Sequence, residues 1–174
     1  MTLSAKELNV DENGLNARPL FSPTEFHRDG FIISTDKARL QLYVIHGFLA
    51  NSSYWAKHVP LAVVRKAIAN SLCFGVYYGD EQIGFARVIS DYATFAYLAD
   101  VFILPIHRGK ALSKWLMSCL FAHPELQGLR RWMLATRDAH GLYAQYGFRV
   151  LEKPERFMEL HDPQVYVQAH PGNN

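Results

Sequence analysis

The sequence predicts a single α/β domain with a central mixed, mostly antiparallel sheet and helices on both of its faces. Stretches with the two-residue periodicity of strands alternate along the chain with stretches of helical periodicity. Gly and Pro residues mark the turns between these stretches. A chain of 174 residues, of which 49% are hydrophobic, can bury one sizeable core without disulfide or metal staples. Helices interspersed with hairpins are typical of a mixed sheet that is covered on both faces.

The composition excludes several other classes of protein. The 18 Lys and Arg residues against 16 Asp and Glu residues give a net charge of +2, which argues against a nucleic-acid binder with a phosphate-seeking surface. The apolar fraction is too high for a disordered protein, and no run approaches the roughly 20 apolar residues of a membrane helix. The N-terminal residues lack the continuous apolar core of a signal peptide. We therefore expect a soluble, cytoplasmic protein without nucleic-acid or membrane partners.

Polar segments flank the predicted domain. Residues 1–29 contain little that could form a core face, which predicts an N-terminal arm that is flexible or loosely docked. Residues 161–174, which include Pro163 and Pro171, are expected to form a C-terminal tail. The domain itself is predicted to span residues 30–160.

Local patterns predict a strand, two helices and a hairpin in the first half of the domain. Leu42, Ile45 and Leu49 recur at helical spacing, and Pro60 suits the first turn of a second helix. A Gly-Asp turn signal separates two apolar segments, as in a β-hairpin. The predicted elements are a strand over residues 31–35, helices over 40–49 and from 60 onward, and strands over 72–78 and 82–89.

The second half is predicted to alternate strands and helices. Leu112, Leu116 and Leu120 lie on one face of an amphipathic helix. Asp138 can cap a short helix, and Gly147 ends it where a left-handed residue is needed. The predicted elements are strands over residues 94–104, 131–136, 148–151 and 156–160, and helices over 108–122 and 138–146.

The segment LADVFILPIHRGKALSKWL, residues 98–116, is the part of the chain that indicates chemistry. An apolar strand runs into a turn of small and basic residues that opens directly into a helix. Unpaired backbone N–H groups and the positive end of the helix dipole meet there, which suits a phosphate or pyrophosphate. Arg108 and Lys110 add positive charge, and the small residues around them permit close backbone approach. The alternative interpretation is an ordinary strand-to-helix turn with solvated basic residues.

Two motifs resemble those of the GNAT superfamily of N-acetyltransferases. VFILPIHRGKALSKWLM, residues 101–117, resembles the acetyl-CoA signature of that family, in which an apolar strand and a Pro precede a basic, glycine-rich turn at a helix start. ATRDAHGLYAQYGF, residues 135–148, resembles the family's second block. The resemblance covers about residues 31–160 and implies a GNAT-like acyl-CoA N-acyltransferase fold with a V-shaped splay between two strands. The residues of the second block that fall in register are Ala139, Leu142, Tyr143, Gly147 and Phe148.

The resemblance also implies a place for acetyl-CoA as co-substrate. A bulged strand over Val101–Leu104 would offer its backbone to the pantetheine arm like an added strand. The turn that follows would cradle the pyrophosphate, and Tyr143 would protonate the departing thiolate as general acid. The implied cofactor-binding residues are Phe102, Ile103, Leu104, Arg108, Gly109, Lys110, Ala111, Leu112, Ser113 and Thr136.

Three positions depart from the family pattern. Ala111 and Ser113 stand where the family usually has smaller residues, and Thr136 stands where it often has an Asn that bonds the pantetheine arm. The extra bulk at the turn leaves the backbone amides available, and the Ser113 hydroxyl can compensate.

Candidates for the acceptor side lie close to the same strand. Asp100 occupies an otherwise apolar strand centre, on the face of Phe102. It is either a general base for the amine or the partner of a structural ion pair with Arg87, and Arg87 is itself expected to line the substrate pocket. His140, three residues before Tyr143 on one helix face, is a weaker candidate for the substrate pocket.

Three aromatic residues allow two interpretations each, whereas the two cysteines favour a single one. Tyr54 and Trp55 either line the acceptor pocket or plug the core beneath the two helices, and Tyr97 allows the same two interpretations. Cys73 and Cys119 lie in apolar segments, which favours core packing over nucleophilic catalysis. The histidines show no metal-ligand spacing, so no metal is expected.

These observations predict an enzyme that transfers an acetyl group from acetyl-CoA to a primary amine of a small molecule or peptide by direct attack. The alternative is a non-catalytic acetyl-CoA-binding sensor or interaction module. A monomer or a homodimer is expected, and neither fold nor motif names the amine.

Overall fold

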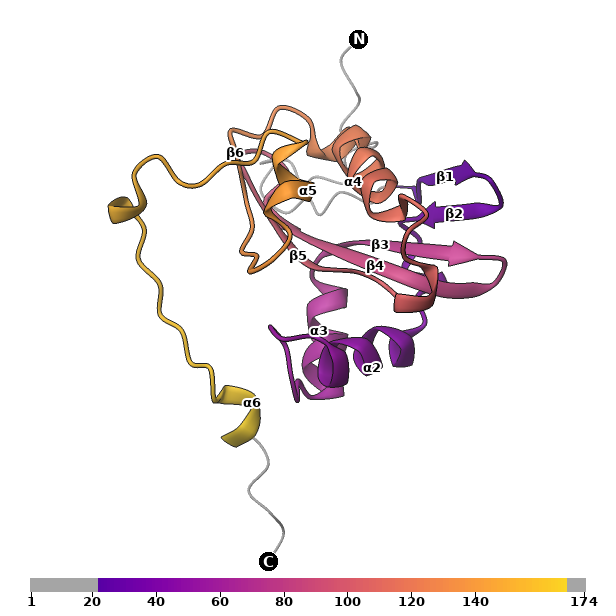
Figure 1. Cartoon of the computed structure of the whole chain (residues 1–174), viewed down its shortest axis with the longest axis horizontal. Coiled ribbons are helices and arrows are strands. Elements are labelled where there is room, and N and C mark those ends of the chain that lie inside the picture. The colour runs from indigo at the N-terminus through magenta and orange to yellow at the C-terminus, as the bar shows by residue number, and fades with distance from the viewer. Residues whose placement is uncertain (1–21, 169–174) are drawn as a thin grey trace, which may run out of the picture.

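The computed structural model describes residues 22–168, which are built on a six-stranded sheet (Figure 1). The strands follow one another across the sheet in chain order, and every neighbouring pair is antiparallel except β5 with β6. The predicted mixed, mostly antiparallel sheet is therefore confirmed. The strands are β1 (Glu25–Arg28), β2 (Phe31–Ser34), β3 (Leu72–Tyr78), β4 (Glu81–Ser90), β5 (Phe95–Ile103) and β6 (Arg131–Met133). The helices are α2 (Leu42–Ser52), α3 (Leu61–Ala69), α4 (Leu112–Ala122), α5 (His140–Ala144) and α6 (Val165–Gln168).

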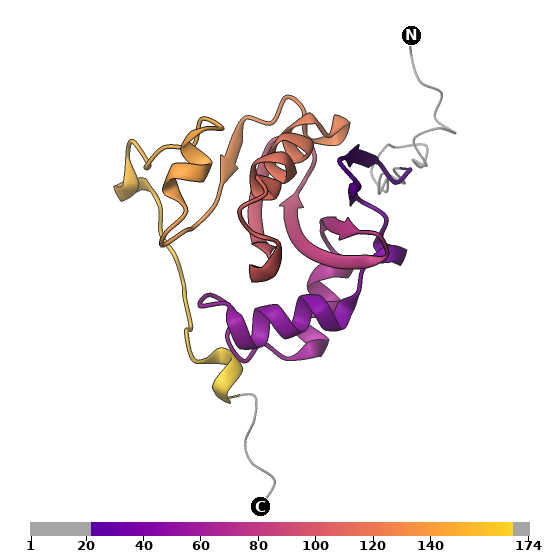
Figure 2. The same cartoon turned by 45° about the vertical axis from the view of Figure 1, so that its right-hand side comes forward.

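Helices cover both faces of the sheet, as predicted (Figures 1 and 2). The apolar faces of α4 and α5 form one core with the sheet, in which Leu116 and Leu120 are fully buried. The apolar faces of α2 and α3 form a second core on the opposite face, around Ile45. Successive strand residues serve the two cores in turn, since Cys73 packs in the second and Phe74 in the first.

Both cysteines are free and buried, in agreement with the expected packing role. Burial raises the pKa of the Cys73 thiol to about 12 and that of the Cys119 thiol to about 11. Both groups are therefore protonated at neutral pH, and a protonated thiol is a poor nucleophile.

A β-bulge in β5 opens the sheet at its centre. Phe85 pairs with Phe102 and Arg87 pairs with Ala99, so two residues of β5 stand opposite one residue of β4. One of these two residues, Asp100, has a left-handed backbone with φ of 55°. Beyond this point β5 has no strand partner on the side of β6 within the described residues, because β6 pairs only with residues 95–97. The predicted V-shaped splay therefore lies between β5 and β6.

The sheet begins earlier in the chain than expected. Residues 25–28, which the sequence analysis assigned to an N-terminal arm, form β1 and pair with β2. This strand is short and polar except for Phe26, so it lacks the apolar pattern that identifies strands. The backbone ladder to β2 and the packing of Phe26 on the first core hold it in place. Residues 1–21 of the predicted arm lie outside the described residues.

The two final predicted strands, over residues 148–151 and 156–160, are wrong for the described part of the chain. That segment contains a 3-10 turn (Pro154–Arg156) and otherwise no regular element. An extended segment becomes a strand only when a neighbouring strand supplies hydrogen bonds, and none of the described residues pairs with the outer edge of β6. As a consequence, the side chains of Met158 and Leu160 are fully exposed.

The C-terminal segment crosses from β6 and α5 to the helices on the opposite face (Figure 2). It ends in α6, where Tyr166 packs against the second core. This short helix lies in the part assigned to a tail, of which residues 169–174 are outside the described residues. None of the helices within residues 22–168 is long and apolar enough to cross a membrane.

Candidate active site

A cavity of about 350 Å³ lies in the splay between β5 and the chain that follows β6. It brings together seven residues that the sequence analysis named for acceptor or donor roles: Tyr54, Trp55, Arg87, Tyr97, Asp100, Thr136 and Tyr143. These residues come from the α2–α3 connection, β4, β5, the β6–α5 loop and α5. The remaining lining residues are Ala56, Leu98, Ala99, Val101, Ala135, Asp138, Ala139 and Tyr166.

An ion pair between Arg87 and Asp100 forms one wall of this cavity. Arg87 Nε lies 2.7 Å from Asp100 Oδ2, and only 15% and 12% of the two side chains are exposed. The indole Nε1 of Trp55 donates a hydrogen bond to Asp100 Oδ1 at 3.1 Å. Arg87 also donates to the Ser71 hydroxyl at 3.2 Å. The structural ion pair that the sequence analysis considered for Asp100 is therefore present, and it faces a cavity.

Tyr54 and Trp55 stand in the wall of the cavity and leave 42% of each side chain exposed. Their rings meet edge to face with centroids 5.0 Å apart. The Tyr54 hydroxyl accepts a hydrogen bond from the Arg137 amide at 2.9 Å, and the Arg137 guanidinium lies 3.9 Å from the Tyr54 ring centroid. These contacts tie the α2–α3 connection to the loop after β6. Both residues therefore line the pocket and are too exposed to be plugs of the core.

Tyr143 faces the same cavity from α5 and is 8% exposed. Burial, and to a lesser extent the neighbouring Tyr54 and Asp138, raises the pKa of Tyr143 to about 12. Within residues 22–168 no hydrogen bond engages its hydroxyl. A turn at Gly147, which has φ of 84°, ends this helical segment as predicted and lets Phe148 pack on the Tyr143 ring.

Two predictions about the loop before α5 are wrong. Asp138 makes no cap hydrogen bond; Thr136 Oγ1 accepts from the Ala139 amide at 3.0 Å and starts the helix. His140 is exposed and does not line the cavity, because the first turn of α5 directs it outward.

The turn before α4 has features that fit a pyrophosphate. Ala111 occupies the N-cap position with φ of 55° and offers no side chain to cap the helix, so the first-turn amides receive no side-chain acceptor. Gly109 also has a left-handed backbone, with φ of 79° and open space beside it. The Leu112 side chain is buried in the core, which leaves only its backbone amide for a ligand.

Side chains hold the shape of this turn. Arg108 Nε donates to the Ile103 carbonyl at 3.0 Å, so that carbonyl already has a partner at the end of β5. The Lys110 ammonium lies 5.6 Å from the Phe31 ring centroid. Arg28 of β1 reaches the Lys110 carbonyl at 3.5 Å and covers the Trp115 ring at 4.6 Å.

Sequence reasoning missed Tyr166 in the cavity and Arg28 beside the turn. Both lie in terminal segments that had been separated from the domain. An aromatic residue within an otherwise polar tail was the one available signal for Tyr166, since such a residue commonly packs on something. Within the described residues, no group of three or more His, Cys, Asp or Glu side chains could hold a metal ion.

Comparison with known proteins agrees with this geometry. A family model described as "Acetyltransferase (GNAT) domain" matches residues 69–150. A solved structure of a GNAT-family protein from Xanthomonas campestris pv. campestris is 54% identical, covers 80% of this chain and 99% of its own, and superposes with a TM-score of 0.78. The Gibberella zeae protein FG08082, provisionally named an acetyltransferase, is 34% identical over 145 residues, which are 71% of this chain and 81% of that protein.

More distant structures share the fold. A GNAT family acetyltransferase from Elizabethkingia anophelis, solved with acetyl-CoA bound, is 14% identical with a TM-score of 0.55 over 72% of this chain and 80% of its own. The family model and these relatives show that the protein is an acyltransferase. The chain belongs to the GNAT family of acetyltransferases.

Proposed function

We propose that this acetyltransferase uses acetyl-CoA to acetylate a primary amine by direct attack, with the amine bound in the cavity beside Asp100 and Tyr143. The observation that carries this proposal is the position of the unbonded Tyr143 hydroxyl in the wall of a cavity at the splay of the sheet. The uncapped turn of α4 follows the other end of the same strand, β5.

The donor end would hold acetyl-CoA through the backbone. The amides at the start of α4 and the cations of Arg28, Arg108 and Lys110 suit a pyrophosphate. The unpaired side of β5 beyond residue 97 suits the amides of a pantetheine arm, as in an added strand. When bound, acetyl-CoA supplies the acetyl thioester, and the residues named here hold and orient it.

Tyr143 would act as a hydrogen-bond donor to the leaving sulfur. Its pKa of about 12 keeps it protonated at every pH at which the protein would work. An ordinary thiol has a pKa of about 8.5, so the departing thiolate is a much weaker base than the Tyr143 phenolate, and complete proton transfer from the phenol to the sulfur is unfavourable. We therefore assign Tyr143 to stabilising the developing negative charge on sulfur, which requires donation but no complete transfer of the proton.

Asp100 would attract and orient the amine. Both of its carboxylate oxygens already accept a hydrogen bond, one from Arg87 and one from Trp55. Each oxygen retains a lone pair for a third donor, such as an ammonium group in the cavity. In this arrangement Asp100 selects for an amine, and water that enters the open cavity carries the proton away before attack.

The test is a free-thiol release assay with acetyl-CoA and a panel of primary amines, run beside a thermal-shift titration with acetyl-CoA. We expect the melting temperature to rise with acetyl-CoA and thiol release to require both the amine and Tyr143. No thiol release with any amine, despite a thermal shift, would contradict the proposed activity. No thermal shift at millimolar acetyl-CoA would contradict the donor.

A further inference from the structure

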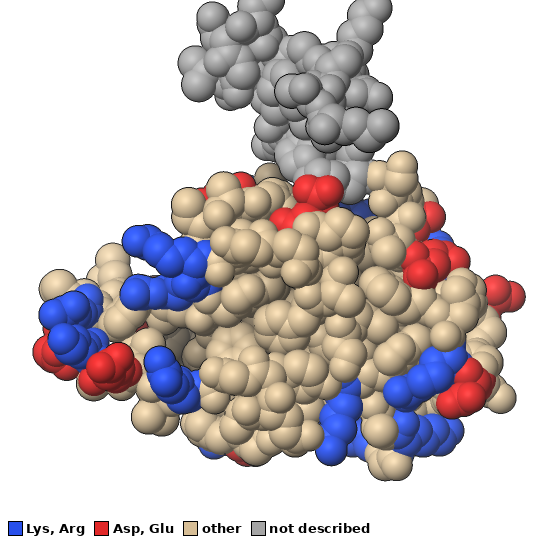
Figure 3. Space-filling model, turned by 90° about the horizontal axis from the view of Figure 1, so that it is seen from above, with Lys and Arg blue, Asp and Glu red and all other residues tan. Residues whose placement is uncertain are grey.

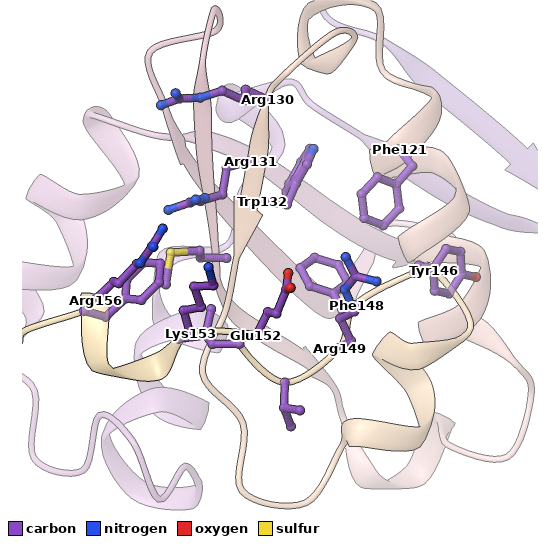
Figure 4. A pocket seen from close by; sticks show the side chains of 15 residues that line it. Phe121, Arg130, Arg131, Trp132, Tyr146, Phe148, Arg149, Glu152, Lys153 and Arg156 are labelled. Carbon is purple, nitrogen blue, oxygen red and sulfur yellow. The ribbon is translucent and has the colours of Figure 1, made fainter.

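A second cavity, of about 580 Å³, lies along the outer edge of β6 and is rich in basic side chains (Figure 4). Its walls come from β6, the end of α4 and the chain from residue 146 to residue 157. We call it the basic pocket. Its basic residues are Arg130, Arg131, Arg149, Lys153 and Arg156, and Glu152 is its single acidic residue.

The charges of the basic pocket are unbalanced. None of its five cationic side chains forms an ion pair within residues 22–168. By contrast, Arg39 in the 3-10 turn after β2 and Arg87 in β4 are each paired with a carboxylate. Five unpaired cations around one cavity repel one another, so an anion that enters the cavity gains attraction from several of them at once.

Aromatic side chains form a firm wall behind these charges. Phe121 packs on Trp132 with ring centroids 4.9 Å apart and on Phe148 at 6.0 Å. Figure 4 shows these rings on one side of β6 and the side chains of Arg131 and Arg156 on the other. The rings therefore bound the basic pocket on the side of α4, and the five cationic side chains around it are exposed.

The basic pocket continues along the chain into the acceptor cavity. Met133 at the end of β6 lines the basic pocket, whereas Ala135 and Thr136 line the acceptor cavity. At about 3.3 Å per extended residue, the two linings are roughly 7–10 Å apart along the chain. The chain around α5 also joins the two cavities, because Tyr143 lines the acceptor cavity and Tyr146, three residues later, lines the basic pocket.

The basic side chains are unevenly distributed over the surface. Figure 3 shows Lys and Arg side chains gathered at two ends of one face, at each end beside Asp or Glu side chains, with largely uncharged surface between the two ends. One of these ends is the end at which Figure 1 places β6 and the C-terminal segment. The net charge of +2 for the whole chain therefore conceals a local excess beside the acceptor cavity.

We infer that the basic pocket binds the anionic part of the acceptor, which makes the preferred substrate a peptide with acidic groups two to three residues from the reacting amine. This inference rests on the proposed function, because it takes the neighbouring cavity as the amine site. Guanidinium groups bind carboxylates and phosphates alike through paired N–H donors. Aspartate, glutamate and phosphoserine side chains are therefore the chemistry that these residues fit.

The experiment compares short peptides that share a free amino terminus and differ at positions three and four. One carries alanines, one carries aspartates and one carries phosphoserines, and kcat/KM is measured for each with saturating acetyl-CoA. We expect kcat/KM at least tenfold higher for the acidic peptides than for the alanine peptide, with a preference that declines as salt is raised. A greater gain for phosphoserine or for aspartate identifies which anion the pocket takes.

Variants test whether the basic pocket causes the preference. The triple change R130Q, R149Q and K153Q removes three exposed cations without touching a packed side chain, and it should reduce kcat/KM for the acidic peptides to near the alanine value. The matched control is R65Q, which removes an exposed cation on α3 and should leave both rates unchanged. Equal rates for acidic and alanine peptides, or a preference that survives the triple change, would overturn the inference.

A binding measurement separates this inference from the proposed activity. A fluorescent aspartate peptide with a blocked amine cannot react, yet it should bind the parent protein at least fivefold more tightly than the triple variant. Charge-dependent binding without any acetyl transfer would support the basic pocket and contradict the proposed activity. Acetyl transfer without charge-dependent binding would contradict the basic pocket alone.

Discussion

The two ends of the splayed sheet handle charge in different ways. At the donor end, Arg108 and Lys110 are held against Ile103 and Phe31, and the backbone amides at the start of α4 are the remaining donors. At the acceptor end, the cations of the basic pocket come from scattered positions and have no anionic partners in the described chain. A site built from backbone amides has a fixed shape, whereas a site built from long side chains adapts to different anions and responds to salt.

The largest expected effect belongs to the residue that lies between these two ends. Tyr143→Phe should lower kcat about 100-fold or more, because a single preorganised hydrogen-bond donor to a developing negative charge typically contributes that much, while the dissociation constant for acetyl-CoA changes little. Stopped-flow or steady-state thiol release together with calorimetric titration measures both quantities. Tyr43→Phe, at an exposed position on α2, is the control and should change neither. An unchanged kcat in Tyr143→Phe would remove this residue from the mechanism.

The raised pKa of Tyr143 adds a dependence on pH. Burial favours the neutral phenol in the folded protein, so this contribution to stability is complete below pH 10 and is lost as the pH rises toward 12. Alkaline unfolding of Tyr143→Phe should therefore lack this component. Because the pKa of Tyr143 is raised to about 12, a fall in activity near neutral pH would come from the titration of a group other than Tyr143.

Asp100→Asn should affect the acceptor end alone. Loss of the charge removes the attraction for an ammonium group and leaves the Arg87 guanidinium, which is 15% exposed, without its anionic partner. We expect KM for the amine to rise about tenfold, the free energy of unfolding to fall by about 1–3 kcal/mol, and acetyl-CoA affinity to remain. Amine kinetics and urea titrations measure these effects. A rise in the dissociation constant for acetyl-CoA would show that the two ends are coupled.

Arg108→Gln provides the matching change at the donor end. It removes a cation and the hydrogen bond from Arg108 to the Ile103 carbonyl, so the dissociation constant for acetyl-CoA should rise about fivefold. KM for the amine should be unchanged. Calorimetric titration of acetyl-CoA at two salt concentrations measures the effect. If the amine KM rises in parallel, the separation between the donor and acceptor ends is wrong.

Tyr166→Ala should have a smaller effect, again on the acceptor. Tyr166 closes one wall of the cavity from α6, and truncation would widen the cavity and raise the amine KM about threefold. Val167→Ala is the control, since Val167 lies on the same helix and does not line the cavity. Equal effects of the two variants on the amine KM would count against a role for Tyr166.

The smallest expected effect concerns the strained turn at the donor end. Ala111 has a left-handed backbone, which costs a non-glycine residue roughly 1–2 kcal/mol. A Gly removes this strain, but it also raises the entropy of the unfolded chain, which offsets part of the gain in stability. Ala111→Gly should therefore raise the free energy of unfolding by about 0.5 kcal/mol in urea titrations. Ala62→Gly, at an exposed helical position of α3, should lower it instead. Destabilisation by Ala111→Gly would contradict the backbone assignment.

Much of the fold and half of the cavity could be predicted from local patterns. The hairpin of β3 and β4 follows from apolar segments and their turn, and Tyr143 follows from a motif within one short segment. The ion pair of Arg87 and Asp100 was predictable because the two lie on adjacent strands at an apolar centre. Local spacing failed for His140, since a single helix turn decides whether a side chain faces the cavity or the solvent.

The sequence by itself determined most of the elements, the family resemblance and the turn before α4, because each depends on residues that are neighbours in the chain. Tertiary structure decided which distant residues share a cavity. Tyr166 lines the same cavity as Tyr54 and Tyr143 only because the C-terminal segment crosses the molecule, and β1 exists only because β2 offers a free edge. The basic pocket arises in the same way, from cations of separate elements that carry no common motif. Such sites depend on contacts between residues far apart in the sequence, and forming those contacts costs the entropy of closing long loops. Local periodicity reports only on neighbouring residues, so it cannot predict them.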